Sequence, residues 1–478
     1  MESIKNQTLR SAKWNTVERF SVQGIQFLLG LIMARILTPD DYGIIGMLSI
    51  FFAVSQSFID SGFSTALIRK ANPTEAEYST VFIFNIVVAI FLYAILFFTA
   101  PYIASFFNLE ILKFIIRVQA ITLIVNSLMV VQVAMLTTKL DFKSLAIRSI
   151  CSTLISGIVG IILAYKGLGV WALVVQGLIL SIVNLVLICW YCKWYPKSHF
   201  SVPAFKELGA FGSKLLVSGL IHTIYVKINT LAIGKFYSAK DLGFYSRGQQ
   251  IAELPNTTIN GVLQTVTYPI LSRIKDDESH LVAVYRRYIR ITSMVIFILC
   301  GTLCALGKPL VLFLLTDKWA DAVPYLQVFA AACMFDHIST INLNLLKVKG
   351  RSDLCLRLEV IKKSIALVLL CCAIPLGVMA ICITAFAYNQ IAIVLNTYYT
   401  GKLFGLTYFM QVGDFVRFLL GTIVACLPTY LITLLGLPNI VTLFIGVAMS
   451  FSIYWMLFRD NEDMIEFVDL IESQLKRK

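Results

Sequence analysis

Long apolar stretches separated by short polar connectors run along almost the whole chain. Each stretch holds about 20 residues or more, which is the length that a helix needs to cross the hydrocarbon core of a bilayer. The chain is therefore expected to be an all-α integral membrane protein. The pattern predicts about fourteen membrane helices, over residues 15–37, 42–68, 79–100, 111–136, 145–165, 169–191, 209–234, 243–271, 286–306, 322–346, 355–375, 377–399, 411–435 and 438–458.

The composition agrees with a membrane protein, and the distribution of charge predicts its orientation. Of the 478 residues, 58% are hydrophobic and 14% are charged, and the mean hydropathy is +0.81, which excludes an ordinary soluble domain. An even number of crossings places both termini on one side, and the connectors on that side are the richer in Lys and Arg. We therefore predict an inner-membrane protein with both termini in the cytoplasm. The net charge of +13 then reflects topology, and it gives no reason to expect nucleic-acid binding.

A short internal repeat divides the predicted helices into two sets. Residues 31–44 (LIMARILTPDDYGI) align without a gap on residues 231–244 (LAIGKFYSAKDLGF), 200 positions later. Six predicted helices separate the two copies, so the halves are expected to be parallel repeats related by an axis along the membrane normal. The predicted domains are a six-helix lobe at 1–200, a second six-helix lobe at 201–405, two additional helices at 406–458 and a cytoplasmic amphipathic tail at 459–478. The tail is expected either to pack on the protein or to lie in the membrane interface.

Polar residues line one face of the second helix in each predicted half. Gln56 on the first of these helices corresponds to Asn256 on the other, and helical spacing extends the second stripe. Polar stripes are costly in hydrocarbon, which favours a central lumen, although ordinary interhelical hydrogen bonding is the alternative. The predicted lumen residues are Gln23, Gln56, Asn256, Asn260 and Gln264.

Four cations lie within the predicted membrane helices or at their ends. They are Arg117, Lys227, Arg247 and Arg19. Arg and Lys side chains suit a phosphate or an acidic sugar, so we predict that these residues bind an anionic headgroup. The alternative is that they snorkel to the lipid headgroups.

Three acids lie within the same helices and are candidates for binding a coupling proton or sodium ion. They are Asp60, Glu253 and Asp336, and the alternative for each is an ion pair with a lumen cation. No motif predicts a metal site, another cofactor or a catalytic residue. The pattern also leaves open whether Lys362 and Lys363 face the lumen.

Two motifs resemble the signature of the polysaccharide transporter family. They are ARILTPDDYG at residues 34–43 and DSGFSTALIR at residues 60–69, which close the first and second predicted helices. The family contains the O-antigen, colanic acid and teichuronic acid flippases, and its superfamily also holds multidrug antiporters and the lipid II flippase. The resemblance extends over the chain in helix number and repeat plan, whereas the motifs lie within the first seventy residues.

The resemblance implies two six-helix lobes around a cationic lumen that opens alternately to the two sides of the membrane. The implied cargo is an undecaprenyl-pyrophosphate-linked oligosaccharide for O-antigen, capsule or exopolysaccharide, with the two additional helices bordering its lipid tail. The implied partners are this lipid-linked oligosaccharide, the membrane lipids, and the polymerase and glycosyltransferases of the same pathway.

Two other functions remain as alternatives to a flippase. An ion-coupled multidrug antiporter of the same superfamily would share the twelve-helix core, but it would be expected to have an anionic cavity. A membrane glycan polymerase would be expected to carry catalytic groups on a sizeable outer loop, whereas the longest outer connector, around residues 308–321, has only about 15 residues. The sequence has no Walker, G-x-S-x-G or H-E-x-x-H motif, so we predict a transporter and not an enzyme.

Overall fold

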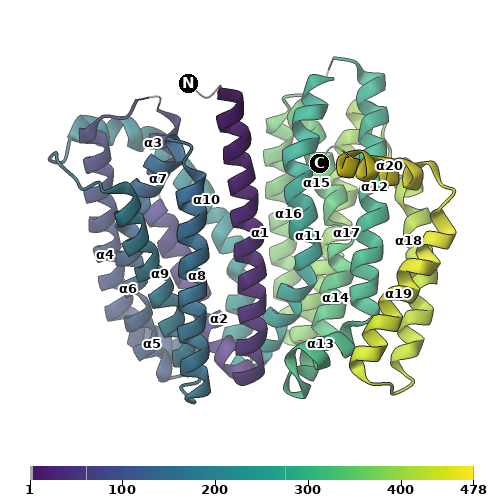
Figure 1. Cartoon of the computed structure of the whole chain (residues 1–478), viewed down its shortest axis with the longest axis horizontal. Coiled ribbons are helices and arrows are strands. Elements are labelled where there is room, and N and C mark those ends of the chain that lie inside the picture. Colours follow the sequence, from purple (N-terminus) through teal and green to yellow (C-terminus); the bar gives the residue numbers. More distant parts are fainter. Residues whose placement is uncertain (1–3, 61, 71, 275, 477–478) are drawn as a thin grey trace. The chain divides into compact units, whose positions relative to one another are not determined.

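The computed structural model describes residues 4–60, 62–70, 72–274 and 276–476, and every regular element in these ranges is a helix (Figure 1). The chain forms two compact units that divide between Gly243 and Phe244. The division therefore falls well after residue 200, where the repeat predicts the lobe boundary.

The first unit holds α1 (Ile4–Ile36), α2 (Pro39–Asp60), α3 (Phe63–Arg69), α4 (Glu75–Phe107), α5 (Ile111–Gln119), α6 (Ile121–Ser127), α7 (Val130–Thr138), α8 (Phe142–Tyr165), α9 (Val170–Cys192) and α10 (Val202–Phe236). The next helix, α11 (Ala239–Arg273), begins in the first unit and continues into the second. The second unit then holds α12 (Glu278–Ala305), α13 (Gly307–Leu315), η1 (Asp317–Ala322), α14 (Val323–Cys333), α15 (Asp336–Val348), α16 (Ser352–Ala373), η2 (Ile374–Leu376), α17 (Val378–Phe404), α18 (Tyr408–Thr433), α19 (Asn439–Phe458) and α20 (Glu462–Lys476).

Each predicted helix coincides with helical structure, but three of them are interrupted. Residues 42–68 are divided into α2 and α3 at Gly62, which has φ +70° and whose added Cβ would lie 2.6 Å from the carbonyl oxygen of Gly212 on α10. A left-handed backbone in close contact with a second helix requires glycine. Residues 111–136 form α5, α6 and α7, and residues 322–346 form α14 and α15. Apolar periodicity continues through these breaks, so the sequence pattern does not reveal them.

Ten helical segments of the described chain are long and apolar enough to cross a membrane, and they establish a multi-pass membrane protein. Four further predicted crossings, namely α1, α11, the α14–α15 pair and α16, are outside this group. The polar residues of α1, α11 and α16 lower their hydropathy, and the break shortens α14 and α15. Such helices cross a bilayer only where their polar groups face protein or water, so the number fourteen stays a prediction.

The first unit is held together by two groups of helix contacts. In the first group, α8 packs between α1 and α9, as Figure 1 shows for α1 and α8. In the second, α10 packs against α2, α3 and α4, and a hydrogen bond of 3.0 Å joins the hydroxyls of Ser57 on α2 and Thr223 on α10. The packing of α10 on α2 explains why the first unit extends beyond the predicted boundary.

The first turns of α2 and α11 are built in the same way. The Thr38 hydroxyl donates to the Asp41 carboxylate at 2.7 Å, and the Asp41 amide donates back to the Thr38 hydroxyl at 3.3 Å. Ser238 and Asp241 make the same pair of hydrogen bonds, at 2.6 Å and 3.1 Å. Reciprocal bonds of this kind cap the N-terminus of a helix. The internal repeat therefore includes two equivalent capped helix starts.

These helix starts cross at a pair of glycines, Gly43 and Gly243. A Cβ added to Gly43 would lie 1.7 Å from the carbonyl oxygen of Ala239, and one added to Gly243 would lie 2.0 Å from the carbonyl oxygen of Pro39. Both the glycines and the residues that they approach are 200 positions apart, so the contact is reciprocal, as at a local two-fold axis. Only glycine lets two helix backbones approach so closely.

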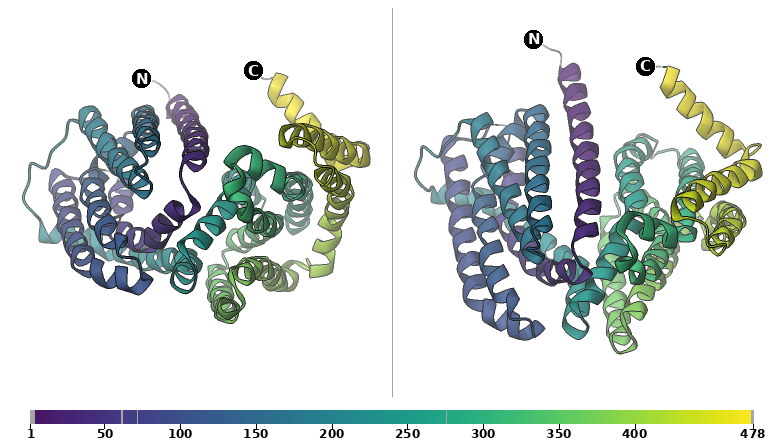
Figure 2. Two further views of the ribbon diagram at one scale, coloured as in Figure 1. Left: turned by 90° about the horizontal axis from the view of Figure 1, so that it is seen from below. Right: turned by 60° about the horizontal axis from the view of Figure 1, so that its bottom comes forward.

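The core of the second unit combines apolar packing with buried amides. Helix α12 packs against α14, α15 and α18, and α18 and α19 lie side by side in both views of Figure 2. Asn342 Nδ2 donates to Gln411 Oε1 at 2.9 Å, and Gln411 Nε2 donates back to Asn342 Oδ1 at 3.3 Å. The Tyr285 hydroxyl donates to the same Gln411 oxygen at 3.1 Å. These bonds pair the buried side chains of Asn342, Gln411 and Tyr285 with one another.

The C-terminal helix α20 packs on the second unit with its apolar face. Met464 is 7% exposed, and Phe467 and Val468 pack against the buried core of the unit. Helix α20 contacts α12. The tail therefore packs on the protein, which is one of the two predicted alternatives.

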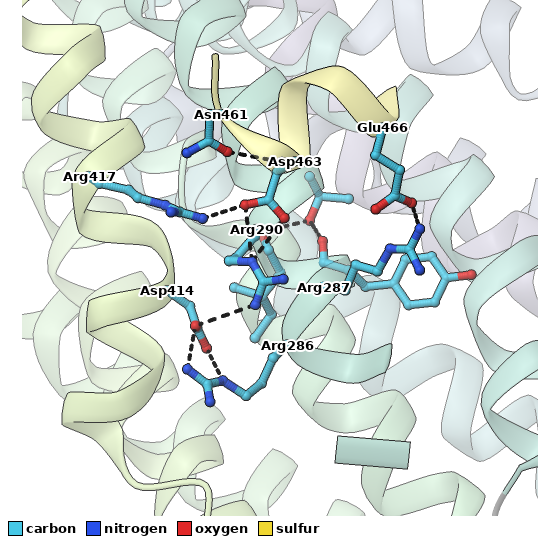
Figure 3. Close-up of polar contacts among 11 residues, drawn as sticks. Arg286, Arg287, Arg290, Asp414, Arg417, Asn461, Asp463 and Glu466 are labelled. Atoms are coloured by element: carbon cyan, nitrogen blue, oxygen red, sulfur yellow. Dashed lines mark hydrogen bonds and ion pairs between the residues drawn. The ribbon is translucent and has the colours of Figure 1, made fainter. Parts of the chain in front are cut away.

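Five ion pairs among the described residues join α20, α12 and α18 to one another (Figure 3). They are Arg290–Asp463, Arg417–Asp463, Arg287–Glu466, Arg286–Asp414 and Arg290–Asp414. Arg286 contacts both oxygens of Asp414, at 2.9 Å and 2.8 Å, and Arg290 Nε contacts both oxygens of Asp463, at 3.0 Å and 3.1 Å. The side chains of Asp414 and Asp463 are only 4% and 6% exposed. Nearly buried carboxylates depend on such partners, because an unpaired buried charge is costly.

A smaller ion cluster anchors the connector between α3 and α4. Lys70 Nζ donates to Glu207 of α10 at 2.7 Å and also contacts Glu77 of α4. Hydrogen bonds from Lys70, first to Glu207 and then to Glu77, raise the pKa of the Lys70 amine. Glu77 also completes a capping box with Thr74 at the start of α4.

Alanine at Gly43 or at Gly243 is expected to destabilise the protein, because the added Cβ would force the two helix starts apart. Overpacking of this kind costs about 1–3 kcal/mol. Thermal unfolding of the purified protein in detergent should therefore begin at a lower temperature for either variant. Gly177→Ala is the matched control, because a Cβ at Gly177 of α9 meets no atom within 4 Å. A Gly43→Ala protein as stable as this control would show that the close crossing is not required.

Asp463→Asn is expected to loosen α20, because it removes the carboxylate that Arg290 and Arg417 share. These arginines are partly exposed, so we expect a loss of about 1–2 kcal/mol of local stability. Hydrogen exchange of the α20 amides should then become about tenfold faster. Asp469→Asn makes the same change in charge at an exposed position of α20 and should leave exchange unaltered. Equal exchange in the two variants would argue against an ionic attachment.

Candidate functional site

In the first unit a chain of polar side chains links α2 to α6. Asn126 Nδ2 donates to Gln56 Oε1 at 3.1 Å, and Gln56 Nε2 donates to Asp60 Oδ1 at 3.0 Å. The structure therefore brings together Gln56, a predicted lumen residue, and Asp60, a predicted ion-binding residue. Asn126 was not among the predicted residues, and its only signal in the sequence is an amide within an apolar run.

In the second unit two amides converge on one carboxylate. Asn389 Nδ2 on α17 donates to Asp336 Oδ1 at 2.6 Å and to the Ala332 carbonyl at 2.9 Å. Asn256 on α11 donates to the other oxygen of Asp336. Both oxygens of the α15 carboxylate therefore accept a hydrogen bond from a different helix. Asn256 and Asp336 are predicted residues, whereas Asn389 was not predicted.

The two contacts are related by the internal repeat. Gln56 and Asn256 are 200 positions apart, and each bonds to a polar residue on the fourth predicted helix of its half. Asn126 lies near the end of α6, just before the break to α7, and Asp336 is the first residue of α15, just after the break from α14. Broken helices are tolerated at membrane depth where the backbone lies in protein or lines an aqueous cavity. The polar stripes thus meet a helix break in both halves.

The predicted headgroup-binding residues of the first unit do not form one cluster. Arg117 on α5 lies against α4, where its Nε donates to the Phe97 carbonyl at 3.4 Å and its guanidinium carbon is 4.3 Å from the centroid of the Phe97 ring. Lys227 is half-buried on α10, and its amine has no hydrogen-bond or ion-pair partner among the described residues. Arg19 is exposed on α1. Each cation therefore lies on a different helix.

The remaining predicted residues differ in burial and in their hydrogen-bond partners. Arg247 is only 8% exposed, donates to Gln250 at 2.6 Å and lies 5.8 Å from the centroid of the Trp319 ring. Glu253 is half-buried and accepts a hydrogen bond of 2.7 Å from Gln249, and Gln23 is exposed on α1. The side chains of Asn260 and Gln264 lie outside the described part of the structure.

The structure also shows a half-buried cation, Arg148, that was not among the predicted site residues. Arg148 on α8 has two nitrogens, Nε and Nη1, that are buried and without a hydrogen-bond partner in the described structure. Its Nη2 donates to the Ser149 hydroxyl at 3.4 Å, and that hydroxyl donates to Glu18 on α1 at 2.6 Å. The sequence suggests only a connector charge, because Arg148 lies near the predicted helix end.

Lys362 and Lys363, whose orientation the sequence left open, both form ion pairs with Glu359 of the same helix. Lys362 is 4% exposed and donates to Glu359 at 2.6 Å, and the Lys363 amine lies 3.8 Å from the other oxygen of Glu359. Helix α16 begins at Ser352 and includes this turn. The two lysines are therefore paired along their own helix.

The arrangement around Asp336 is suited to binding or releasing a small cation. Both amides present N–H groups to the carboxylate, and hydrogen bonds of this kind stabilise its ionised form. A proton could bind directly to the carboxylate, whereas a sodium ion would require carbonyl or amide oxygens as further ligands. The Ala332 carbonyl, which shares the Asn389 amide with Asp336, and the side-chain oxygens of Asn256 and Asn389 after rotation of their amides could supply them.

Comparisons with known proteins agree with this architecture. Residues 32–324, more than half of the chain, match the family described as "Polysaccharide biosynthesis protein". The chain is 27% identical over 356 residues to the teichuronic acid biosynthesis protein TuaB of Bacillus subtilis (strain 168), covering 74% of each chain. It is 22% identical over 321 residues to the succinoglycan biosynthesis transport protein ExoT of Rhizobium meliloti (strain 1021), covering 67% of this chain and 65% of that protein.

A solved structure of the lipid II flippase MurJ, in an inward closed conformation, shares the fold. The TM-score is 0.71 at 14% sequence identity, and the match covers 94% of this chain and 99% of that chain. The helical architecture is thus that of the flippase structure, and the family match agrees with the resemblance seen in the two sequence motifs. The chain belongs to the polysaccharide biosynthesis protein family.

Proposed function

We propose that this protein is a flippase that moves a lipid-linked oligosaccharide across the inner membrane for the synthesis of a surface polysaccharide. The related proteins support this role, because one is named for teichuronic acid biosynthesis and another for succinoglycan transport. A flippase fold is consistent with it. The protein acts as a carrier and not as an enzyme, so the cargo leaves unchanged.

The observation that carries the proposal is the polar contact that recurs in both repeats. Gln56–Asn126 and Asn256–Asp336 are hydrogen-bonded pairs between helices, and in each pair one partner lies at a helix break. In transporters, discontinuous helices at repeat-related positions form the sites for cargo and ions. Two six-helix lobes, with α18 and α19 as the additional pair, would then open alternately to the two membrane faces.

The cargo proposed is an oligosaccharide on undecaprenyl pyrophosphate. Its pyrophosphate is anionic, which suits Arg117 and Lys227 as the first cations to bind it. Arg19 is accessible on α1, whereas Arg247 is mostly buried and is the least suited of the four predicted residues. The lipid tail would remain in the bilayer while the sugar passes between the lobes.

Orientation follows from charge, and the neighbours in the pathway follow from the cargo. With both termini in the cytoplasm, the cargo would be taken up on the side where glycosyltransferases assemble it. A polymerase would use it on the other side. Asp336, with Asp60 and Glu253 as further candidates, would bind the proton or sodium ion that drives the return of the carrier.

Reconstitution in liposomes tests the proposal directly. The full chain, inserted into vesicles that contain a fluorescent lipid-linked oligosaccharide, should make the sugar accessible to a membrane-impermeant enzyme on the opposite face. The recovered lipid should be chemically unchanged. A polymerase would lengthen the glycan, and a multidrug antiporter would leave the sugar where it was, so either result would refute a flippase.

Arg117→Ala and Lys227→Ala are each expected to lower the rate of oligosaccharide transport by about 10- to 100-fold, because a hydrogen bond to a charged group contributes about 1.5–3 kcal/mol. The amount of protein in the membrane should not change. Arg117→Lys keeps the charge and should retain more activity than Arg117→Ala. Lys166→Ala removes an exposed cation just after α8 and is the control. Unchanged transport in both alanine variants would exclude these residues from cargo binding.

Asp336→Asn is expected to abolish stimulation of transport by an ion gradient, because an amide keeps the size of the carboxylate but cannot change its charge. Transport into vesicles is compared with and without an imposed pH gradient and, separately, a sodium gradient. The gradient that stimulates the native protein identifies the ion. Asp317→Asn changes an exposed acid in η1 and should behave as the native protein does. Full stimulation in Asp336→Asn would place coupling elsewhere.

A further inference from the structure

A small cationic pocket lies in the first unit, apart from the polar contacts described above. It has a volume of about 240 Å³. It is lined by Arg10, Ser11 and Trp14 of α1 and by residues 139–143, which form the connector after α7 and the first two residues of α8. Arg10, Lys139 and Lys143 are exposed cations, and Asp141 is the one carboxylate in this lining. The lining therefore has two positive charges in excess.

Two distant parts of the chain are bonded together to form this pocket. The Ser11 hydroxyl donates to the Leu140 carbonyl at 3.0 Å, and Ser11 is 6% exposed. Asp141 is engaged with the start of α8, because it accepts hydrogen bonds from the Ser144 hydroxyl at 2.7 Å and from the Ser144 amide at 3.2 Å. The single acid thus caps a helix, whose N-terminus also favours an anion.

The pocket lies where two membrane-crossing segments meet their connector. One candidate membrane span ends at Thr138 and the next begins at Phe142. Residues 139–141 are therefore expected at the boundary between the hydrocarbon core and the lipid headgroups. Trp14 lines the same pocket, with the Lys143 amine 6.0 Å from the centroid of its ring. Tryptophan and lysine side chains are typical of the headgroup region of a bilayer. Charge and position together indicate a ligand that belongs to the membrane surface.

We propose that this pocket binds the phosphate of an anionic phospholipid, such as phosphatidylglycerol, on the membrane face that the Lys and Arg distribution predicts to be cytoplasmic. Basic pockets between membrane helices on that face bind anionic headgroups. The volume is below the range of about 300–1,000 Å³ for drug-sized ligands, so the pocket suits one phosphodiester and not an oligosaccharide. A bound lipid would hold α1 against the α7–α8 connector.

Tryptophan fluorescence offers a direct test, because Trp14 is part of the pocket. The full chain is reconstituted in phosphatidylcholine vesicles, and phosphatidylglycerol or phosphatidylcholine with bromine near the headgroup is added as quencher. Subtracting the quenching seen in Trp14→Phe isolates Trp14 from the other five of the six tryptophans. Brominated phosphatidylglycerol should quench Trp14 at a lower mole fraction than brominated phosphatidylcholine. No oligosaccharide is present, so the result does not depend on transport.

Charge variants test whether the pocket itself causes the preference. Lys139→Gln and Lys143→Gln should each weaken phosphatidylglycerol binding about fivefold, since one lysine near a membrane surface contributes about 1 kcal/mol. Lys143→Arg should preserve binding, and Lys166→Gln, beyond the opposite end of α8, should not affect it. Equal quenching by the two lipids would overturn the proposal. So would an undiminished preference for phosphatidylglycerol in the Lys139→Gln and Lys143→Gln variants.

Discussion

The close crossing of two helix starts at Gly43 and Gly243 is the constraint on which the rest of the structure depends. Each glycine lies against a backbone carbonyl of the other repeat, and a side chain at either position would collide with it. The capping pairs Thr38–Asp41 and Ser238–Asp241 fix where the two helices begin, just before the crossing. Gln56 and Asn256 then follow their glycines by the same number of residues. Since a helix rises about 1.5 Å per residue, both lie roughly 20 Å from the crossing along their helices. Each polar residue therefore lies at the same distance along its own helix from its glycine.

Most helices of the fold could be predicted from the sequence, because about 20 apolar residues in succession leave few alternatives to a membrane helix. The breaks in the second, fourth and tenth predicted helices could not. A break depends on backbone dihedral angles and on contacts such as that of Gly62 with Gly212, and apolar periodicity does not record these. The compact units divide between Gly243 and Phe244, whereas the lobes at 1–200 and 201–405 stay a prediction from the repeat. The repeat marks where a sequence pattern begins again, whereas compactness depends on the packing of α10 against α2.

The repeat gave two independent signals for one polar position of the candidate site. Gln56 and Asn256 occupy matched stripes, and each forms a hydrogen bond to another helix, which is the alternative that the sequence left beside a lumen. The lumen itself stays a prediction. The bonded partners Asn126 and Asn389 were missed, because the pairing of residues across helices needs three-dimensional packing. The predicted headgroup-binding cations, which no second copy of the repeat supports, gave a weaker indication of a binding site. Arg247 is a polar residue in a membrane helix like Arg117, yet the structure buries it beside Trp319, and sequence cannot distinguish an accessible cation from a buried one.

The two polar sites are related by the repeat, but their carboxylates are bonded to different numbers of helices. Protonation or cation binding would therefore have different structural effects at the two sites. In the first unit the carboxylate is Asp60, which is exposed and whose described bond is to Gln56 on its own helix. In the second unit the carboxylate is Asp336, which accepts hydrogen bonds from α11 and α17 at the start of α15. Protonation or cation binding at Asp60 would alter one helix locally. The same event at Asp336 would change the bonds that join three helices, at a break where the chain can bend. Under the proposed coupling, a change of charge at Asp336 would therefore act on more helices than one at Asp60.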